Sequence, residues 1–433
     1  MLFRIIHLIT LLGILLGAGV TSGDCATRMR PSEQRGLERA REYLAQDEYA
    51  AAVTVLKPLL EREEHHPLVD FYRGLIAQTQ GEYAAACTWF ERSVANDAGL
   101  QAGWINLARC RFEIREFAAA AQAFAQSYTL SDPPEPRWRY NAALAWYQAG
   151  ELKRARELMQ QLVKDFPTAV ELQWRELLVH IYLQQDGEQN RRLALPHVRI
   201  LAQESSAAAQ RRWCEYLIHL YLQLDMPAQA REFVTHLLEV ESLEPRWWRI
   251  SAHLHLEAQR YADALAALQV AGFLAPGDAR EERLRADLCM QLGIPVQAIP
   301  YFTDLLEEHT ANAEEREVLL GLAQAYVRRH KPQEALEYLA RIDTTQESVA
   351  QLRLRARILY MLEDYAQAHA AYVALARREQ QGRGSARAWL FAGYAAWNAG
   401  ELEAAQEALR QAAQEAEFRS QAQQLLRHLQ TLR

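Results

Sequence analysis

The chain has 433 residues, half of them hydrophobic (50%), with few glycines and prolines (19 and 14). This length allows either a few ordinary domains or one long array. The formal net charge of −7 comes from interspersed charges of both signs, which argues against a general nucleic-acid binder. Runs of β-branched residues are scarce and apolar residues recur at i, i+3 and i+4, so the sequence predicts an all-α protein.

The first residues differ in kind from the rest of the chain. Met1–Arg4 is short and basic, Ile5–Val20 is apolar except for one histidine, and Gly23 is a small residue suited to cleavage. This order is typical of a secretory signal peptide, because the apolar run is short and interrupted by glycine. We expect residues 1–23 to be removed, with cleavage within 19–26, and the remainder to be exported to a bacterial periplasm. An uncleaved anchor is the alternative.

Cys25 follows this leader and could carry a lipid. The preceding Ser22, Gly23 and Asp24 lack the aliphatic first residue and the small last residue of a lipobox, so lipid anchoring is not expected. The other cysteines lie in predicted helices without metal-site spacing or a disulfide framework. We interpret them as small packed residues: Cys87, Cys110, Cys214 and Cys289.

Residues that begin predicted second helices recur at a fixed spacing. Tyr49, Tyr83 and Phe117 are 34 residues apart, and Leu152 follows 35 residues later. Each follows a polar turn and precedes an alanine by three residues: Ala52, Ala86, Ala120 and Ala155. The spacing of 34 returns later, at Pro227, Tyr261 and Pro295. A small residue at a fixed repeat position lets two helices approach closely.

Gln101–Pro133 shows one repeat most clearly. Trp104 on its first segment and Phe124 on its second match the pattern W-x2-L-G-x2-Y…A-x3-F…P, with Ala108 in the glycine position and Arg111 in the tyrosine position. The stretch therefore resembles a tetratricopeptide (TPR) repeat. The resemblance implies an α-solenoid of about eleven helix-turn-helix repeats, wound into a right-handed superhelix with a concave inner surface.

The repeats are expected to form two arrays and a cap. Residues 31–204 hold about five repeats, of which the fifth is stretched and carries Pro196. Residues 205–416 hold about six more, interrupted by one linker-like stretch at Gln380–Ser385. Residues 417–433 are expected to form a solvating helix that covers the open end of the array.

No catalytic motif is present: there is no GxSxG, HExxH, glycine-rich phosphate loop or paired CxxC. Glu63–His66 gathers acids and imidazoles on a predicted loop, which we interpret as a solvated charge run. His253 and His255 are two residues apart, so a helix turns them about 200° from each other and they cannot share a metal ion. We expect no enzymatic activity, no cofactor and no metal.

Alignment of the first helices brings basic and aromatic residues to matching positions. At position 9 of the first helix, histidine occurs in three successive repeats. At position 2, arginine occurs in four repeats and again at Arg387. In the TPR family, positions 2, 5, 9, 12 and 13 of the first helix line the groove. The resemblance thus implies these groove residues: Arg137, Tyr140, Tyr147, His180, Arg212, His219, Arg246, His253 and Arg280. Shared ancestry alone is the alternative explanation for their recurrence. The nearby tryptophans are interpreted as core residues: Trp174, Trp213 and Trp247.

The favoured function is an exported, non-catalytic scaffold that holds a segment of a partner protein in its groove. A cation at the second helical position opposes the helix dipole, so helix stability does not explain the arginines. Arginine suits bidentate capture of carboxylates, which favours an acidic segment. The strongest contacts are expected at Arg212, Arg246, His219 and His253.

Three phrases carry a narrower resemblance: EPRWRYNAALAWYQAGE, EPRWWRISAHLHLEAQRY and ARAWLFAGYAAWNAGELEAA. They resemble exported TPR proteins that accompany TonB–ExbB–ExbD systems, which implies an accessory role in TonB-dependent uptake. Two other classes remain open: an envelope biogenesis factor that organises polysaccharide or peptidoglycan assembly enzymes, and a non-catalytic regulatory subunit of an enzyme. In none of these do we expect nucleic-acid binding, or a membrane span after signal cleavage.

Overall fold

The computed structural model describes residues 29–185, 187–308, 312–342, 347–379 and 383–431. The expected signal peptide and Cys25 lie outside these ranges. Within them all regular structure is α-helical, in 23 helices, which confirms the all-α prediction and corresponds to eleven helix pairs followed by one more helix. None of the helices described is long and apolar enough to cross a membrane.

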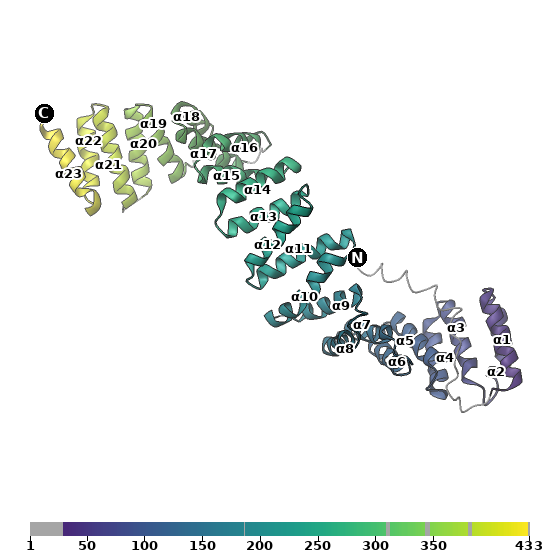
Figure 1. Ribbon diagram of the computed structural model, residues 1–433. Helices are drawn as coiled ribbons and strands as arrows, with labels where there is room; N and C mark the ends of the chain where they lie inside the picture. The colour runs from purple at the N-terminus through teal and green to yellow at the C-terminus, as the bar shows by residue number, and fades with distance from the viewer. Residues whose placement is uncertain (1–28, 186, 309–311, 343–346, 380–382, 432–433) are drawn as a thin grey trace. The chain divides into compact units, whose positions relative to one another are not determined.

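The chain divides into two compact units, Met1–Met226 and Pro227–Arg433. The expected division between residues 204 and 205 concerned repeat regularity and stays a prediction. The helices of the first unit follow one another in chain order (Figure 1). They are α1 (Pro31–Ala45), α2 (Tyr49–Leu60), α3 (Pro67–Thr79), α4 (Tyr83–Asn96), α5 (Gln101–Glu113), α6 (Phe117–Thr129), α7 (Pro136–Gln148), α8 (Leu152–Asp165), α9 (Leu172–Gln184), α10 (Glu188–Glu204) and α11 (Ala207–Gln223).

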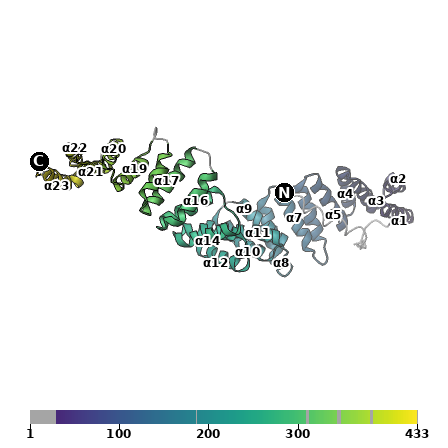
Figure 2. The same ribbon diagram turned by 90° about the horizontal axis from the view of Figure 1, so that it is seen from above.

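The second unit continues the same alternation, and Figure 2 shows the helices of each unit from above. Its helices are α12 (Pro227–Val240), α13 (Pro245–Glu257), α14 (Tyr261–Leu274), α15 (Ala279–Gln291), α16 (Pro295–Glu308), α17 (Asn312–Arg328), α18 (Pro332–Ala340), α19 (Val349–Met361), α20 (Tyr365–Arg378), α21 (Arg383–Asn398), α22 (Leu402–Ala412) and α23 (Ala416–Thr431).

Each turn from a first to a second helix contains one residue with positive φ. In the second repeat this residue is Gly81, and the N–H of Glu82 donates to the carbonyl of Ala77 at 2.9 Å, which closes the end of the first helix. A similar positive φ recurs at Asp47, Arg115, Gly150, Asp225, Gln259, Gly293, His330, Glu363 and Gly400, and Gly187 has a larger φ of 130°. These tight turns reverse the chain and make the two helices of each repeat antiparallel.

Small residues on first helices allow the second helices to pack against them. A Cβ atom added to Gly74 would lie 2.7 Å from Cε1 of Phe90, and one added to Gly321 would lie 2.6 Å from Cζ of Phe302. Both rings are buried, with exposed fractions of 0% and 1%. The repeat period therefore reflects a physical requirement for close packing of a bulky residue against a small one.

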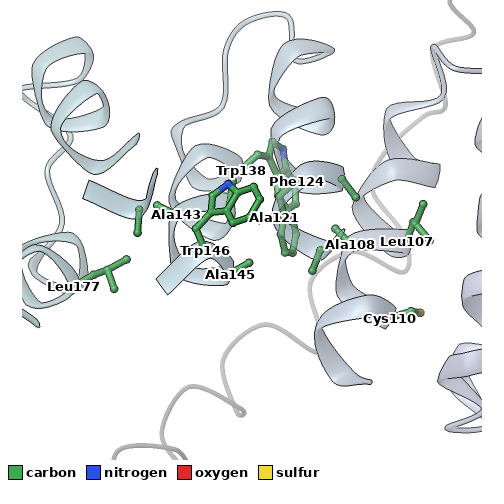
Figure 3. Packing of buried hydrophobic residues seen from close by; sticks show 14 of the residues in the cluster. Leu107, Ala108, Cys110, Ala121, Phe124, Trp138, Ala143, Ala145, Trp146 and Leu177 are labelled. Carbon is green, nitrogen blue, oxygen red and sulfur yellow. The ribbon is translucent and has the colours of Figure 1, made fainter. Parts of the chain in front are cut away.

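Aromatic rings fill the contacts between repeats. Figure 3 shows Trp138, Phe124 and Ala121 together in the core of the first unit, and the rings of Trp138 and Phe124 stack with centroids 6.4 Å apart. The tryptophans interpreted as core are buried, with exposed fractions of 2%, 5% and 1% for Trp174, Trp213 and Trp247. That prediction is confirmed.

The irregular parts of the array differ in detail from expectation. The fifth repeat has a second helix of 17 residues, α10, that contains Pro196. The expected linker Gln380–Ser385 is shorter than predicted, because α21 already begins at Arg383; residues 380–382 lie outside the described part. At the end of the chain, α23 buries Ala422 and Leu429 in a cluster shared with α21 and α22.

Candidate functional site

The first helices of successive repeats approach one another directly. Contacts between alternate helices join α1 to α3, α3 to α5 and α7 to α9 in the first unit, and α17 to α19 and α21 to α23 in the second. First helices that lie close together line the inner side of a curved stack. Which positions of the first helices line that side stays a prediction from the TPR resemblance.

In the first unit, α9 and α11 carry a row of aromatic and basic side chains that we call the cation–aromatic strip: His180, Arg212, Trp213, Tyr216 and His219. The ring of His180 lies 6.3 Å from Trp213, Trp213 meets Tyr216 edge-on at 6.1 Å, and Tyr216 lies 6.5 Å from His219. The guanidinium carbon of Arg212 lies 5.4 Å from the centroid of Trp213. Each ring of the strip therefore packs against the next one.

The strip has a buried floor and an exposed edge. Trp213 is buried and Tyr216 and His180 are half-buried, whereas Arg212 and His219 are exposed. The guanidinium of Arg212 therefore remains accessible to a ligand while its position is favoured by the indole face beneath it. The sequence analysis found His180, Arg212 and His219 by repeat register; Tyr216 has no matching register position and was missed.

Burial controls the charge of His180. Burial lowers its pKa, the carboxylate of Glu176 raises it, and the cation of Arg212 lowers it further. The net effect is a lowered pKa, so His180 is less readily protonated than a free histidine. His219 lies on the exposed edge, where a ring nitrogen is 2.7 Å from the side-chain amide nitrogen of Gln223.

Two more cations lie on earlier first helices of the same unit. Arg137 is the second residue of α7; its guanidinium carbon lies 4.6 Å from the Trp138 ring centroid, and its side chain pairs with Glu135. Arg109 on α5 is half-buried, and burial together with the nearby charge of Arg137 lowers its pKa. The sequence analysis missed Arg109, although it occupies position 9 of the Gln101–Pro133 repeat.

The two tyrosines predicted to line the groove are packed against neighbouring residues more than they are exposed to solvent. Tyr140 stacks on Trp174 with centroids 6.4 Å apart, and burial, helped by Glu176 and Glu171, raises its pKa to about 12. Tyr147 is half-buried, and burial raises its pKa as well. It lines a shallow, open hollow together with Gln148, Gly150, Leu152 and Gln184.

The remaining predicted groove residues belong to the second unit. Arg246, His253 and Arg280 are exposed on α13 and α15. His253 lies 3.4 Å from Glu257 on the next turn of its helix. The proposed grouping of Arg246 and His253 with the strip crosses between the units and stays a prediction.

Other arginines of the second unit join repeats to each other. The side chain of Arg249 donates to Glu281 at 2.6 Å and to the carbonyl of Ala275 at 2.9 Å. Buried Arg285 pairs with Glu281 and Glu282. These guanidinium groups are engaged in the structure of the array, unlike the exposed edge of the strip.

The acid and imidazole run at Glu63–His66 differs from the sequence interpretation. His66 is buried and caps α3, where its ring accepts from the N–H of Leu68 at 3.3 Å. His65 lies 3.0 Å from the fully buried carboxylate of Asp70. The two histidines are therefore packed structural residues, and only the two glutamates form a solvated run. Within the residues described, no group of three His, Cys, Asp or Glu side chains could hold a metal ion.

Comparison with known proteins places the chain. A family model described as "Tetratricopeptide repeat" matches residues 37–100, 104–170, 284–348 and 353–420, more than half of the sequence. No curated protein matches the chain.

Solved structures with some similarity to the chain include the following three. "YrrB: a TPR protein with an unusual peptide-binding site" has 19% identity, covers 44% of this chain and 96% of its own, and has a TM-score of 0.37. The APC/C hetero-tetramer Cut9-Hcn1 has 14% identity, 93% and 90% coverage and a TM-score of 0.31. Yeast Tom70 has 11% identity, 92% and 96% coverage and a TM-score of 0.29. Given its helix pairs, its repeat spacing and the extent of the family match, the chain belongs to the tetratricopeptide repeat family.

Proposed function

We propose that this TPR protein is a non-catalytic scaffold that binds an extended, acidic segment of a partner protein along the cation–aromatic strip. The observation that carries the proposal is the accessible guanidinium of Arg212 above Trp213, in line with Tyr216 and the two histidines. TPR arrays use the concave surface formed by their first helices for binding.

The chemistry of the strip favours carboxylates joined to apolar groups. Arginine offers several N–H donors in a planar fork that matches a carboxylate. Because Arg212 already rests on an indole face, less conformational freedom is lost when it binds. The half-buried rings of Tyr216 and His180 add a surface for apolar side chains beside the charged contact.

The field around the strip adds to this preference. Arg109 and Arg137 place two further cations on first helices of the same unit. The carboxylate of Glu176 lies close enough to raise the pKa of His180 and partly offsets this charge. Exposed cations such as Arg212 speed the association of an acidic partner and make that association depend on salt.

Synthetic peptides test this proposal. A fluorescent 12-residue peptide with glutamate at alternate positions and leucine between them is compared with a twin in which glutamine replaces glutamate. We expect the acidic peptide to bind more tightly, and Arg212→Ala to weaken it by about 10- to 100-fold, the equivalent of one charge-assisted hydrogen-bonding group. The matched control is Arg192→Ala, which removes an exposed arginine paired with Glu188 on the second helix α10.

Equal affinity for the two peptides would contradict the preference for carboxylates. If Arg212→Ala and Arg192→Ala weakened binding of the acidic peptide equally, the attraction would be a general effect of charge and not a specific site. Selective binding of a glucan or peptidoglycan oligosaccharide, with neither peptide bound, would instead favour the envelope biogenesis alternative.

We also propose that the scaffold works outside the inner membrane, as an accessory of a TonB–ExbB–ExbD system. The support is the signal-peptide pattern at Met1–Gly23 and the resemblance of the three repeat phrases. N-terminal sequencing of the mature protein and cell fractionation test the location. Recovery of intact Met1 in the membrane fraction would contradict export, and failure to co-purify any TonB-system component after mild cross-linking would contradict the narrower role.

A further inference from the structure

Cys87 and Cys110 face each other across a helical hairpin of the first unit. Cys87 on α4 precedes the turn at 97–100 by ten residues, and Cys110 on α5 follows it by ten. Antiparallel helices joined by a short turn bring such symmetric positions opposite each other. Both side chains lie in the same apolar cluster between α4 and α5, with exposed fractions of 6% and 0%, and each thiol is the main influence on the pKa of the other.

The two thiols are not equivalent. The hydrogen bond from Cys110 lowers the pKa of Cys87 despite its burial, and the neighbouring cation of Arg111 acts in the same direction. The same hydrogen bond and burial raise the pKa of Cys110. Cys87 is therefore the thiol that ionises first, and the slightly exposed one of the pair.

The other described cysteines provide a contrast. Cys214 donates a weak hydrogen bond to the carbonyl of Ala202 at 3.5 Å, and Cys289 is fully buried on α15 in the other unit. Burial raises the pKa of Cys289. Each has an environment typical of an inert, packed cysteine.

We propose that Cys87 and Cys110 form an intrachain disulfide that fastens α4 to α5 when the protein meets a disulfide oxidant. The thiolate of Cys87 attacks the oxidant's disulfide, which breaks, and the departing thiolate takes up a proton. Cys110 then loses its proton and attacks the Cys87 sulfur of the mixed disulfide, expelling the second oxidant thiol. Two protein thiols are oxidised and one oxidant disulfide is reduced to two thiols.

The disulfide would join the second repeat to the third. It would hold α5, which carries Arg109 one residue before Cys110, against α4. The proposal does not depend on the identity of the partner, and its chemistry can be tested without knowing where the protein resides. Export would supply the oxidising surroundings in which such bonds persist.

Peptide-resolved thiol mapping of the full chain tests the inference. The reduced protein is incubated in its native form, and in parallel refolded from urea, in a buffer of oxidised and reduced glutathione. It is then denatured, alkylated with iodoacetamide and digested for mass spectrometry. We expect a linked peptide joining Cys87 to Cys110 and near-complete loss of alkylation at both, while Cys214 and Cys289 stay fully alkylated.

Two variants separate the proposed bond from general oxidation. Cys110→Ser should abolish the linked peptide and leave glutathione on Cys87, whereas the control Cys214→Ser should keep the link. Full alkylation of Cys87 and Cys110 after refolding in the oxidising buffer would overturn the proposal, because burial cannot protect thiols of an unfolded chain. Glutathione retained on Cys87 of the parent chain without closure would overturn it as well.

Discussion

Alanine in place of Gly74 tests the close contact on which the repeat packing depends. The added Cβ would lie 2.7, 2.8 and 3.0 Å from Cε1, Cδ1 and Cζ of Phe90, which is fully buried and cannot move toward solvent. Overpacking of this kind costs about 1–3 kcal/mol, while alanine gains about 1 kcal/mol over glycine in helix propensity. The net loss expected for Gly74→Ala is on the order of 1 kcal/mol.

The effect of Gly74→Ala on stability should change sign when the ring of Phe90 is removed. In a Phe90→Ala background the overlapping ring atoms are absent, so adding Gly74→Ala should stabilise the helix pair by up to about 1 kcal/mol relative to Phe90→Ala alone. Native-state hydrogen exchange of the α3 and α4 amides measures the local stability. Gly321→Ala, tested with Phe302→Ala, probes a contact between two repeats of the second unit and should affect α16 and α17 instead.

The reasoning fails if Gly74→Ala stabilises α3 and α4 as helix propensity alone would predict. It also fails if Gly74→Ala has the same effect on stability with phenylalanine and with alanine at position 90. Either result would show that the small residue is not required by the contact.

Three further changes should have effects of predictable direction. Gly81→Ala should lower the free energy of unfolding, measured with urea, by about 1 kcal/mol, and Gly81→Asn should lower it less, because no atom lies within 4 Å of the new Cβ and only the positive φ opposes the substitution. Equal stability of the parent and the two variants would contradict this. Burial and the charge of Arg175 lower the folded-state pKa of His197 to about 4, below its unfolded value, so stability should fall as pH drops from 6.5 toward 4. If stability fell just as steeply with pH in His197→Gln, this cause would be excluded. Deletion of Phe418–Arg433 should expose the apolar faces of α21 and α22 and speed hydrogen exchange there, and uniform protection would count against a capping role.

The repeat architecture could be predicted from sequence because its determinants are local and periodic. A spacing of 34 residues, an alanine three residues into each second helix and a polar turn between helices are visible in the letters. Gly81 and Gly150 mark turns directly, but Arg115 and Glu363 adopt the same positive φ without any compositional signal. The surrounding helices impose the turn at those positions.

The candidate site was only partly accessible to such reasoning. Repeat register located Arg212 and His219, because register determines which face of a first helix a residue occupies. It could not show that the side chain of Arg212 lies over its neighbour Trp213, which depends on side-chain conformation, or that burial lowers the pKa of His180, which depends on its contact with Trp213 and on its surroundings.

The interpretation of His65 and His66 was wrong because their contacts also depend on packing. His65 and His66 were assigned to a solvated run, yet one contacts the buried carboxylate of Asp70 and the N–H of the other donates to Glu33 on α1. The spacing of Cys87 and Cys110 is symmetric about a turn that the sequence analysis did not use, and their shared apolar cluster depends on how α4 and α5 pack.

Photo-cross-linking tests the central claim, that a partner segment lies along the cation–aromatic strip. The photoreactive residue p-benzoylphenylalanine replaces Tyr216 on α11, and in a control chain it replaces Leu193, which is 40% exposed on the second helix α10. Each chain is irradiated with the acidic peptide and with its glutamine twin. We predict cross-linking from position 216 to the acidic peptide, at a yield that falls when Arg212 is also changed to alanine, and little from position 193. Equal yields from both positions, or a yield at 216 that does not depend on Arg212, would contradict the account.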